Sequence, residues 1–271
     1  MAEYVFLLAK GVIIMNNFCI IEGITAVSAV INNTLKNNSN SPRRISELYF
    51  DSSKLKKFDR SMYARYKFLK QNAENCQYDF IELPTEELNK IFQGNTHGGI
   101  GAKCQCPDIP SLTSESIKKE GFYCYLDGID DPFNLGYIIR TLYPLGCDGI
   151  ILSQNNKLAY SPSTVIKSSA GITEMIDIYT ASPEDFCSLM HANSYRIACA
   201  SIRDSVSASC ADFTLPIALV IGGEKRGISR KILECSDLNV RIDYAIPFNG
   251  SLPSVCASSV LAYEISKFIK K

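Results

Sequence analysis

The sequence has no surplus of charge of either sign, because 28 Lys and Arg residues are balanced by 28 Asp and Glu residues. Proteins that wrap nucleic acid by overall positive charge need many surplus basic residues, so the charge balance excludes this class of protein. Nucleic acid could then be bound only through a local basic patch. The chain is 46% hydrophobic and has no internal repeat or low-complexity tract, which excludes collagen-like and mostly disordered proteins.

Long apolar runs are also missing. The apolar start, residues 4–15, is interrupted by Lys10 and Gly11 and falls short of the roughly 20 residues that a membrane-spanning helix needs. It also lacks the charged start and the small-residue cleavage site of a secretion signal. We therefore expect no membrane association and a cytoplasmic protein.

Metal-ligand spacing is scarce as well. Cys104 and Cys106 lie close together with His97 nearby, but no second pair follows at zinc-ligand spacing, so we expect no metal. Eleven cysteines are an odd number in a long chain without a secretion signal. The sequence therefore predicts reduced thiols that act mainly as small buried hydrophobic residues.

What is present divides into two parts. Prolines, serines and acidic residues replace periodic hydrophobicity just after Cys106, which predicts a linker over residues 107–119. We expect one domain over 1–106 and another over 120–271. In the first, Val27, Val30 and Ile31 are at helical spacing. A second helical stripe and two short strand-like runs complete a smaller α/β domain. The strand-like runs are residues 48–50 and 80–83. The helical stripe consists of Leu55, Phe58, Met62, Tyr66 and Leu69.

The second part predicts an α/β fold with a mostly parallel sheet and helices on both faces. Short apolar runs alternate with segments compatible with helices; the runs are residues 122–126, 149–152, 197–200, 217–221 and 240–246. In such sheets ligands bind outside the carboxyl ends of the strands. The segments that follow the runs are therefore the candidates for chemistry.

The first such segment, residues 127–140, follows the run that ends at Leu126. Pro132 suits the start of a helix, and Asn134 is a candidate to cap or orient its first turn. Arg140 lies among apolar residues, so it needs either a functional role or a structural partner such as Asp127.

The second segment, residues 219–229, has glycines at the spacing of a phosphate loop. Ile228 occupies the position where a phosphate-binding loop requires lysine, which excludes a nucleoside triphosphatase of this type. Gly222 and Gly227 allow close backbone approach to a ligand, with Glu224 at the end of the strand. A plain strand-to-helix turn is the alternative.

The third segment, residues 245–258, leads into a C-terminal helix that Ser251 or Ser254 is placed to cap. Free backbone donors of the first turn of that helix are then available to a ligand. The run 98–101 lacks the full spacing of a dinucleotide fingerprint, which disfavours a nucleotide-dependent metabolic enzyme.

In their order and spacing the three segments resemble the motifs of the SpoU-type (TrmH-like) RNA 2′-O-ribose methyltransferases. Asn134 with Arg140, and Gly222 and Glu224 with Gly227, match the first two motifs. In the third, residues 246–247 and Gly250 fit, and 261–264 resemble the following helix. The resemblance covers residues 120–271, and the first part is similar, through 21–27 and 97–102, to the ribosomal-protein-like RNA-binding domain of many members.

The resemblance implies a catalytic domain with a C-terminal trefoil knot, S-adenosylmethionine as the cofactor, RNA, expected to be ribosomal, as the substrate, and a homodimer that completes the site. It assigns the catalytic group to Asn134, Arg140, Glu224 and Ser251. It assigns backbone contacts with the cofactor to Gly222, Ile246 and Leu252.

One position departs from the family. The family has Ser-Leu-Asn before the last helix, and this aligns with 251–253 or with 254–256; we prefer the first, because it keeps Ser-Leu. Either way Pro253 or Cys256 replaces an amide that both donates and accepts hydrogen bonds. A non-catalytic or weakly active RNA-binding relative is therefore the alternative. A Cys256 nucleophile is disfavoured, because no histidine is near it in sequence.

Basic residues interleaved with aromatic ones in the first part indicate an RNA-binding patch, since cations bind phosphates and rings stack on bases. The core of this predicted patch is Lys54, Lys56, Lys57 and Arg60. The alternative is a helix whose rings face the core, which the spacing of Phe58, Met62 and Tyr66 favours.

Overall fold

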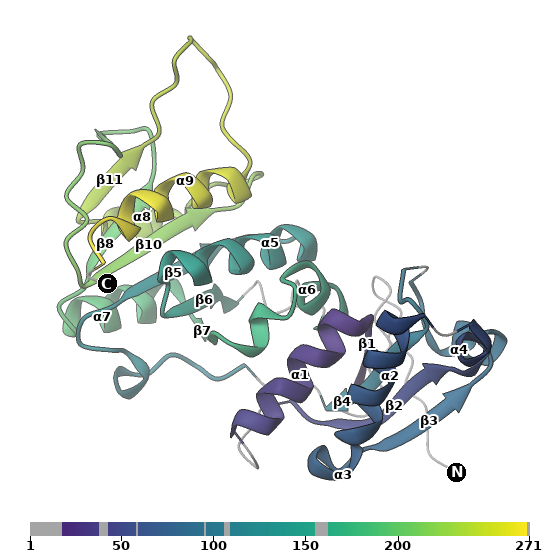
Figure 1. Cartoon of the computed structure of the whole chain (residues 1–271). Coiled ribbons are helices and arrows are strands. Elements are labelled where there is room, and N and C mark those ends of the chain that lie inside the picture. Colours follow the sequence, from purple (N-terminus) through teal and green to yellow (C-terminus); the bar gives the residue numbers. More distant parts are fainter. Residues whose placement is uncertain are drawn as a thin grey trace, which may run out of the picture. The chain divides into compact units, whose positions relative to one another are not determined.

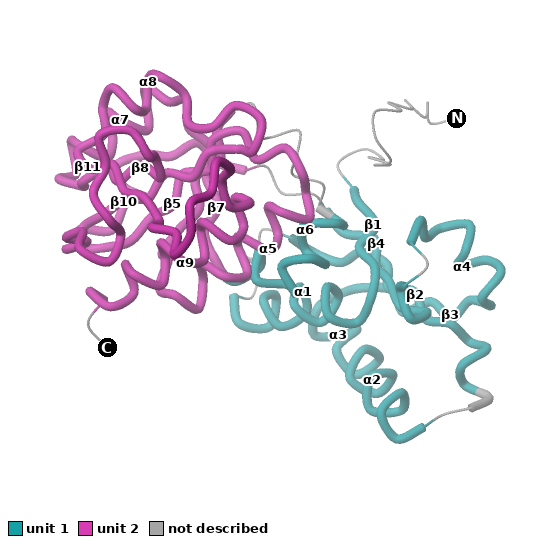
Figure 2. The backbone as a smooth tube through the Cα atoms, turned by 90° about the horizontal axis from the view of Figure 1, so that it is seen from above, with its two compact units in different colours: residues 1–108, 161–175 teal, residues 109–160, 176–271 magenta. Residues whose placement is uncertain are grey.

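A computed structural model describes residues 18–37, 43–57, 59–94, 96–105, 109–154 and 162–269. The chain forms two compact units (Figure 2), of which unit 1 comprises residues 1–108 and 161–175 and unit 2 comprises 109–160 and 176–271. The predicted division of the chain at a single linker differs from these two units, because residues 161–175 belong to unit 1. The described part of the predicted linker packs into unit 2, where Leu112 and Ile117 are buried in the core.

Unit 1 is built on a four-stranded mixed sheet of order β1-β4-β2-β3, in which only β2 and β3 are parallel. Its strands are β1 (Phe18–Glu22), β2 (Ile45–Asp51), β3 (Asp79–Leu83) and β4 (Ile100–Gln105). Its helices are α1 (Ile24–Asn37), η2 (Ser52–Lys57), α2 (Arg60–Gln71), α3 (Ala73–Cys76), α4 (Thr85–Ile91), α6 (Pro162–Ser168) and η6 (Ile172–Glu174).

The helical patterns of unit 1 are confirmed with one change. Val27, Val30 and Ile31 are fully buried along α1, as their spacing predicts. The second stripe is not one helix but two, because Asp59 caps a new one: its carboxylate accepts a hydrogen bond from the Met62 backbone N–H at 2.7 Å. Phe58 lies outside the described residues.

Unit 2 is a seven-stranded sheet of order β7-β6-β5-β10-β8-β11-β9. Every neighbouring pair is parallel, which confirms the predicted architecture. The strands are β5 (Phe122–Asp127), β6 (Gly149–Ser153), β7 (Asp177–Ala181), β8 (Arg196–Ala200), β9 (Val206–Ser207), β10 (Ile217–Gly222) and β11 (Leu238–Arg241). The helices are η3 (Ser114–Ser116), α5 (Pro132–Leu142), η4 (Tyr143–Leu145), α7 (Pro183–Ala192), α8 (Arg230–Glu234) and α9 (Ser254–Ser266).

Helices cover both faces of this sheet (Figure 1). On one face Phe186 of α7 and Ile232 of α8 join a core with Tyr125 and Val220, while α5 packs against α9 on the other. Residues 217–221 of β10 are all buried, because a parallel strand covered on both faces has no solvent side. In the described part of the chain, no helix has the length and apolar character needed to cross a bilayer.

Two strand predictions need correction. The apolar run 240–246 forms a strand only up to Arg241, and Ile246 is 73% exposed in the loop that follows. Strands β1, β4, β7 and β9 were not predicted; β7 alternates polar with apolar residues at an edge, and β9 has only two residues.

Candidate functional site

A pocket lies at the carboxyl ends of β8, β10 and β11, as expected for an open parallel sheet. Its walls combine small and apolar residues, among them Ala200, Ile221, Val240, Ala257 and Leu261. The pocket also brings together Gly222, Glu224, Ser251 and Leu252 from two separate predicted motifs. Its charged lining residues are Glu224 and Arg241.

The Gly222–Ser229 segment makes a tight turn at the edge of the pocket. The Gly227 N–H donates to the Gly223 carbonyl at 2.8 Å, and Gly227 has a φ of +66°. Asp127, at the end of β5, anchors both sides of the turn, since its carbonyl accepts from the Gly223 N–H at 2.8 Å and its carboxylate accepts from the Ser229 N–H at 2.7 Å.

The glycines of this turn are needed for contacts within the chain. A Cβ on Gly222 would lie 2.4 Å from the Gly227 carbonyl carbon, and one on Gly223 would lie 2.0 Å from the Gly128 carbonyl oxygen. Both neighbours are backbone atoms, which cannot move aside cheaply. The sequence predicts glycines for close approach to a ligand; here they let two loops of the protein meet, and the resulting wall faces the pocket.

The third segment enters α9 differently from the prediction. Pro253 occupies the N-cap position and no serine side chain caps the helix. Ser254 is instead 5% exposed, and its hydroxyl donates to the Gly222 carbonyl at 2.8 Å, so it joins α9 to the end of β10. Ser251 is exposed at the pocket, and the Leu252 N–H donates to the Tyr244 hydroxyl at 3.3 Å.

The first segment folds as predicted at Pro132, which takes the first turn of α5. The cap is Asp131 rather than Asn134: the Asp131 carboxylate accepts from the Asn134 backbone N–H at 2.8 Å. Arg140 is exposed on α5, and among the residues described it has no ion-pair partner, so the structural pair with Asp127 is not formed. Asn134, Arg140 and Ile246 do not line the pocket.

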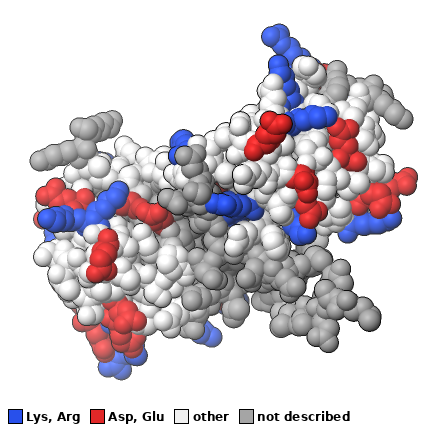
Figure 3. Space-filling model, turned by 90° about the horizontal axis from the view of Figure 1, so that it is seen from below, with Lys and Arg blue, Asp and Glu red and all other residues white. Residues whose placement is uncertain are grey.

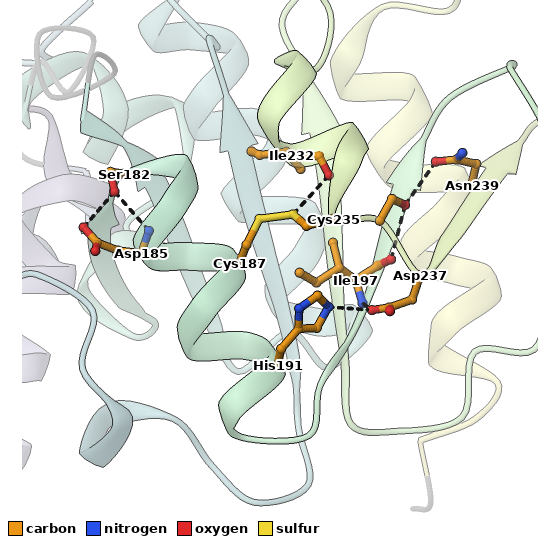
Figure 4. Close-up of a disulfide and its surroundings, with 10 residues drawn as sticks. Ser182, Asp185, Cys187, His191, Ile197, Ile232, Cys235, Asp237 and Asn239 are labelled. Atoms are coloured by element: carbon orange, nitrogen blue, oxygen red, sulfur yellow. Dashed lines mark hydrogen bonds and ion pairs between the residues drawn. A yellow bond between two sulfur atoms is a disulfide. The ribbon is translucent and has the colours of Figure 1, made fainter.

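Most of the described cysteines follow the prediction, but Cys210 and Cys256 are exposed free thiols. Six described cysteines are buried free thiols, and burial raises the pKa of Cys199 to about 11. Cys187 of α7 and Cys235 at the end of α8, however, form a disulfide, so the prediction of reduced thiols is wrong for this pair (Figure 4). They are 48 positions apart, and only the packing of α7 beside α8 brings them together.

A polar contact lies beside this disulfide. His191 Nε2 is 2.9 Å from the Asp237 carboxylate, which also accepts from the Ile197 N–H (Figure 4). Within the described ranges no group of His, Cys, Asp and Glu is arranged to hold a metal ion. Cys106, one of the weighed zinc ligands, lies outside those ranges.

The predicted RNA-binding patch is described only in part. The Lys54 ammonium donates to the Gly98 carbonyl, and Arg60 is exposed at the start of α2. The side chains of Lys56 and Lys57 lie outside the described residues. Tyr66 packs on the core of unit 1, as its spacing favours, whereas Tyr63 is 55% exposed. Basic and acidic side chains are interspersed on the face drawn in Figure 3.

Unit 2 is thus a parallel α/β unit with a pocket at the carboxyl ends of its strands, which is where open α/β sheets bind ligands. Residues 121–263 match the SpoU rRNA Methylase family, and this match spans more than half of the chain. The chain therefore belongs to the SpoU family.

The relatives agree with this assignment. An uncharacterized tRNA/rRNA methyltransferase of Borreliella burgdorferi is 28% identical over 216 residues, which cover 74% of this chain and 92% of that protein. An rRNA methyltransferase from Sinorhizobium meliloti is similar in structure, with a TM-score of 0.76 and 18% identity over 94% of this chain and 89% of that one. The SpoU methyltransferase AviRb from Streptomyces viridochromogenes, solved with AdoMet, has a TM-score of 0.75 and 19% identity over 93% and 90%. At these identities the likeness of the structures shows the fold.

Proposed function

We propose that the chain transfers a methyl group from S-adenosylmethionine to a ribose 2′-hydroxyl of a structured RNA, with ribosomal RNA as the expected substrate. The observation that carries the proposal is the pocket where the second and third motifs meet, in a chain of the SpoU family. The names of the relatives support the substrate class, since they include tRNA/rRNA methyltransferases and an RNA 2′-O ribose methyltransferase. Unit 1 is the proposed RNA-binding domain.

The chemical character of the residues that line the pocket suits S-adenosylmethionine. Apolar side chains such as Ile221, Val240 and Leu261 offer a surface for an adenine ring, and backbone at Gly222 and Leu252 offers polar groups beside it. Gly222 and Leu252 would hold the cofactor there; Ile246, also predicted, is exposed in the adjoining loop. When bound, the cofactor supplies an activated methyl group on sulfur.

The residues of this chain would position the acceptor. Methyl transfer is an in-line displacement, so near-attack geometry supplies much of the rate. The ribose hydroxyl must also lose a proton, and a guanidinium stays protonated up to about pH 12. We therefore assign Arg140 to clamp the nucleotide and stabilise the developing alkoxide, in preference to the role of base. Glu224, Ser251 and Asn134 would orient these groups.

Because Arg140 does not line the pocket of its own subunit, we propose a homodimer that completes the site. Phe133, Tyr137 and Arg140 follow one stripe of α5 at spacings of four and three residues, and the first two are 53% and 45% exposed. Val260 and Tyr263 form a matching exposed stripe on α9, which packs against α5. A second copy of this chain would cover both stripes and bring Arg140 to the other pocket. The SpoU assignment leads us to propose a knot in this unit, where α9 returns from β11 to the centre of the sheet.

The dimer surface predicts a change of oligomeric state on substitution. Tyr137→Glu places a charge in the proposed apolar interface, so we expect sedimentation as a monomer and loss of methylation with retained far-ultraviolet circular dichroism. Tyr244→Glu, on a tyrosine that is 39% exposed and lines the pocket rather than this surface, is a control for oligomeric state alone. A Tyr137→Glu protein that remains dimeric would contradict the interface.

The proposed function predicts binding of S-adenosylmethionine in the micromolar range by calorimetry and methyl incorporation into RNA. Gly222→Ala should abolish binding, because the new Cβ meets the backbone of Gly227. Gly128→Ala, whose Cβ meets nothing within 4 Å, controls for the glycine substitution, although its φ of +79° costs some stability. Mapping of the methylated nucleoside by mass spectrometry distinguishes ribose from base methylation. A protein that does not bind the cofactor would refute the proposal.

Pro253 supports a second candidate function, a weakly active or silent RNA-binding relative. It stands at the N-cap of α9, where the family has asparagine and where a proline side chain can form no hydrogen bond. We expect Pro253→Asn to raise the methylation rate at least tenfold and to stabilise α9 by about 1 kcal/mol, because asparagine is a favourable N-cap. Pro253→Ala, which frees the backbone but adds no amide, is the matched control. Equal rates for both variants and the parent would show that the amide is not required.

A further inference from the structure

The tip of the Gly223–Gly227 turn carries three charged residues, of which only Glu224 lines the pocket. Lys225 and Arg226 follow it, and both side chains are exposed. Gly227, next in the chain, lines the pocket again. The two cations therefore stand between pocket-lining residues, at the mouth of the site rather than on a remote surface.

The turn holds its tip on an anchored base. The Gly227 N–H donates to the Gly223 carbonyl, and the N–H groups of Gly223 and Ser229 each donate to Asp127 of β5. Close backbone packing at Gly222 and Gly223 leaves no room for a side chain at either position. A rigid base lowers the entropy lost when the tip binds a ligand.

In the described part of the chain, the two basic side chains at the tip make no ion pair or hydrogen bond that stabilises the fold. Within the part of the chain that the structure describes, neither Lys225 nor Arg226 forms an ion pair or a hydrogen bond. Arg241, the basic residue that does line the pocket, is paired with Asp243 at 2.8 Å. The tip thus presents adjacent positive charges with no structural task, beside a pocket whose only acidic lining residue is Glu224.

We infer that Lys225 and Arg226 bind the RNA backbone phosphates on either side of the target ribose and position its 2′-hydroxyl at the pocket. The inference rests on the proposed function. A ribose is flanked by phosphates, one of them on the carbon next to the 2′-hydroxyl, so cations at the mouth of the pocket meet phosphate when the sugar enters. Contacts of this kind fix register without reading sequence. They also provide local positive charge in a protein whose net charge is zero.

The test uses the full-length protein and an in vitro transcribed ribosomal RNA. Lys225→Glu and Arg226→Glu are compared with the control Lys119→Glu. The control also reverses one positive charge, at an exposed residue just before β5, at the amino edge of the same sheet. RNA affinity is measured at several salt concentrations, S-adenosylmethionine affinity by calorimetry, and methylation by KM and kcat.

Each tip variant should bind RNA about tenfold more weakly or worse and lower the salt slope by about 0.7–0.9, the value for one lost phosphate contact. KM for RNA should rise while the affinity for S-adenosylmethionine stays within twofold, and Lys119→Glu should behave as the parent. If the tip variants and Lys119→Glu have the same slope and affinity, the inference is overturned while cofactor binding still supports the proposed function. If the parent fails to bind this RNA, the inference also falls. If it binds RNA through the tip but transfers no methyl group, phosphate binding by the tip is supported, while the proposed function and the positioning of the 2′-hydroxyl fail.

Discussion

Replacement of Arg140 by alanine is expected to lower kcat for RNA methylation by about 10²–10³, the loss typical of removing one positioned donor to a developing oxyanion. Arg140 is exposed and, in the described residues, unpaired, so its removal should leave the fold and S-adenosylmethionine affinity unchanged. Single-turnover methylation with saturating RNA and cofactor measures this effect. Arg230→Ala, on an arginine whose side chain is 91% exposed on α8, is the matched control.

Arg140→Lys separates the clamp from simple charge. Lysine keeps the positive charge but loses the planar fork that binds phosphate through two parallel hydrogen bonds. We expect most of the alanine loss to persist in the lysine variant. A rate equal to that of the parent would show that the fork is not essential and would contradict the clamp. Recovery of activity in mixed dimers of Arg140→Ala with a Glu224→Ala partner would show that the two groups act across subunits.

The second large effect is expected in unit 1, at the buried pair of Arg43 and Glu174. Their side chains are 1% and 3% exposed, and Arg43 Nε donates to Glu174 at 3.2 Å. Arg43 also donates to the Cys19 sulfur at 3.4 Å, and the Thr173 hydroxyl donates to Glu174 at 3.3 Å. Glu174→Ala removes the carboxylate that is paired with the buried Arg43 guanidinium, so we expect a loss of about 3–5 kcal/mol in the free energy of unfolding.

This loss is to be measured by urea unfolding with circular dichroism and located by hydrogen exchange in β1 and α6. Glu87→Ala, which removes one partner of an exposed pair in the same unit, should cost less than about 1 kcal/mol. The double variant Arg43→Met/Glu174→Leu should recover most of the loss, because no buried charge remains. A Glu174→Ala protein as stable as the Glu87→Ala control would refute the account.

The local patterns predicted the elements that local physics determines. The continuous apolar run of β10 identified a strand buried on both faces, and Val27, Val30 and Ile31 identified the buried side of α1. Contacts between distant segments could not be predicted this way. The hydrogen bond from Ser254 to Gly222, the Cys187–Cys235 disulfide and the Arg43–Glu174 pair join positions far apart in sequence. Only the assembled fold brings them together.

The site was predicted in the same uneven way. The sequence predicted site residues just after the carboxyl ends of the strands. The structure brings four of them together around one pocket, namely Gly222, Glu224, Ser251 and Leu252. The structure places Arg140 and Asn134 on α5, outside that pocket. In the proposed homodimer their place in the site depends on a second copy of the chain, which a single sequence does not describe. The capping roles were mistaken because Asp131, three residues before Asn134, caps α5, and Pro253, between Ser251 and Ser254, occupies the N-cap position of α9.

The segment 161–175 has a consequence for how this protein can be divided. It follows β6 of unit 2 in sequence, yet Ile166 lies in the core of unit 1, and Gly171 packs so closely on α1 that a Cβ would lie 2.3 Å from the Ala29 methyl group. A fragment that ends at the linker would lack Ile166 and Glu174, and would remove the carboxylate that pairs with Arg43. The amino-terminal half is therefore not a transferable module, and recombination at the linker would exchange an incomplete fold.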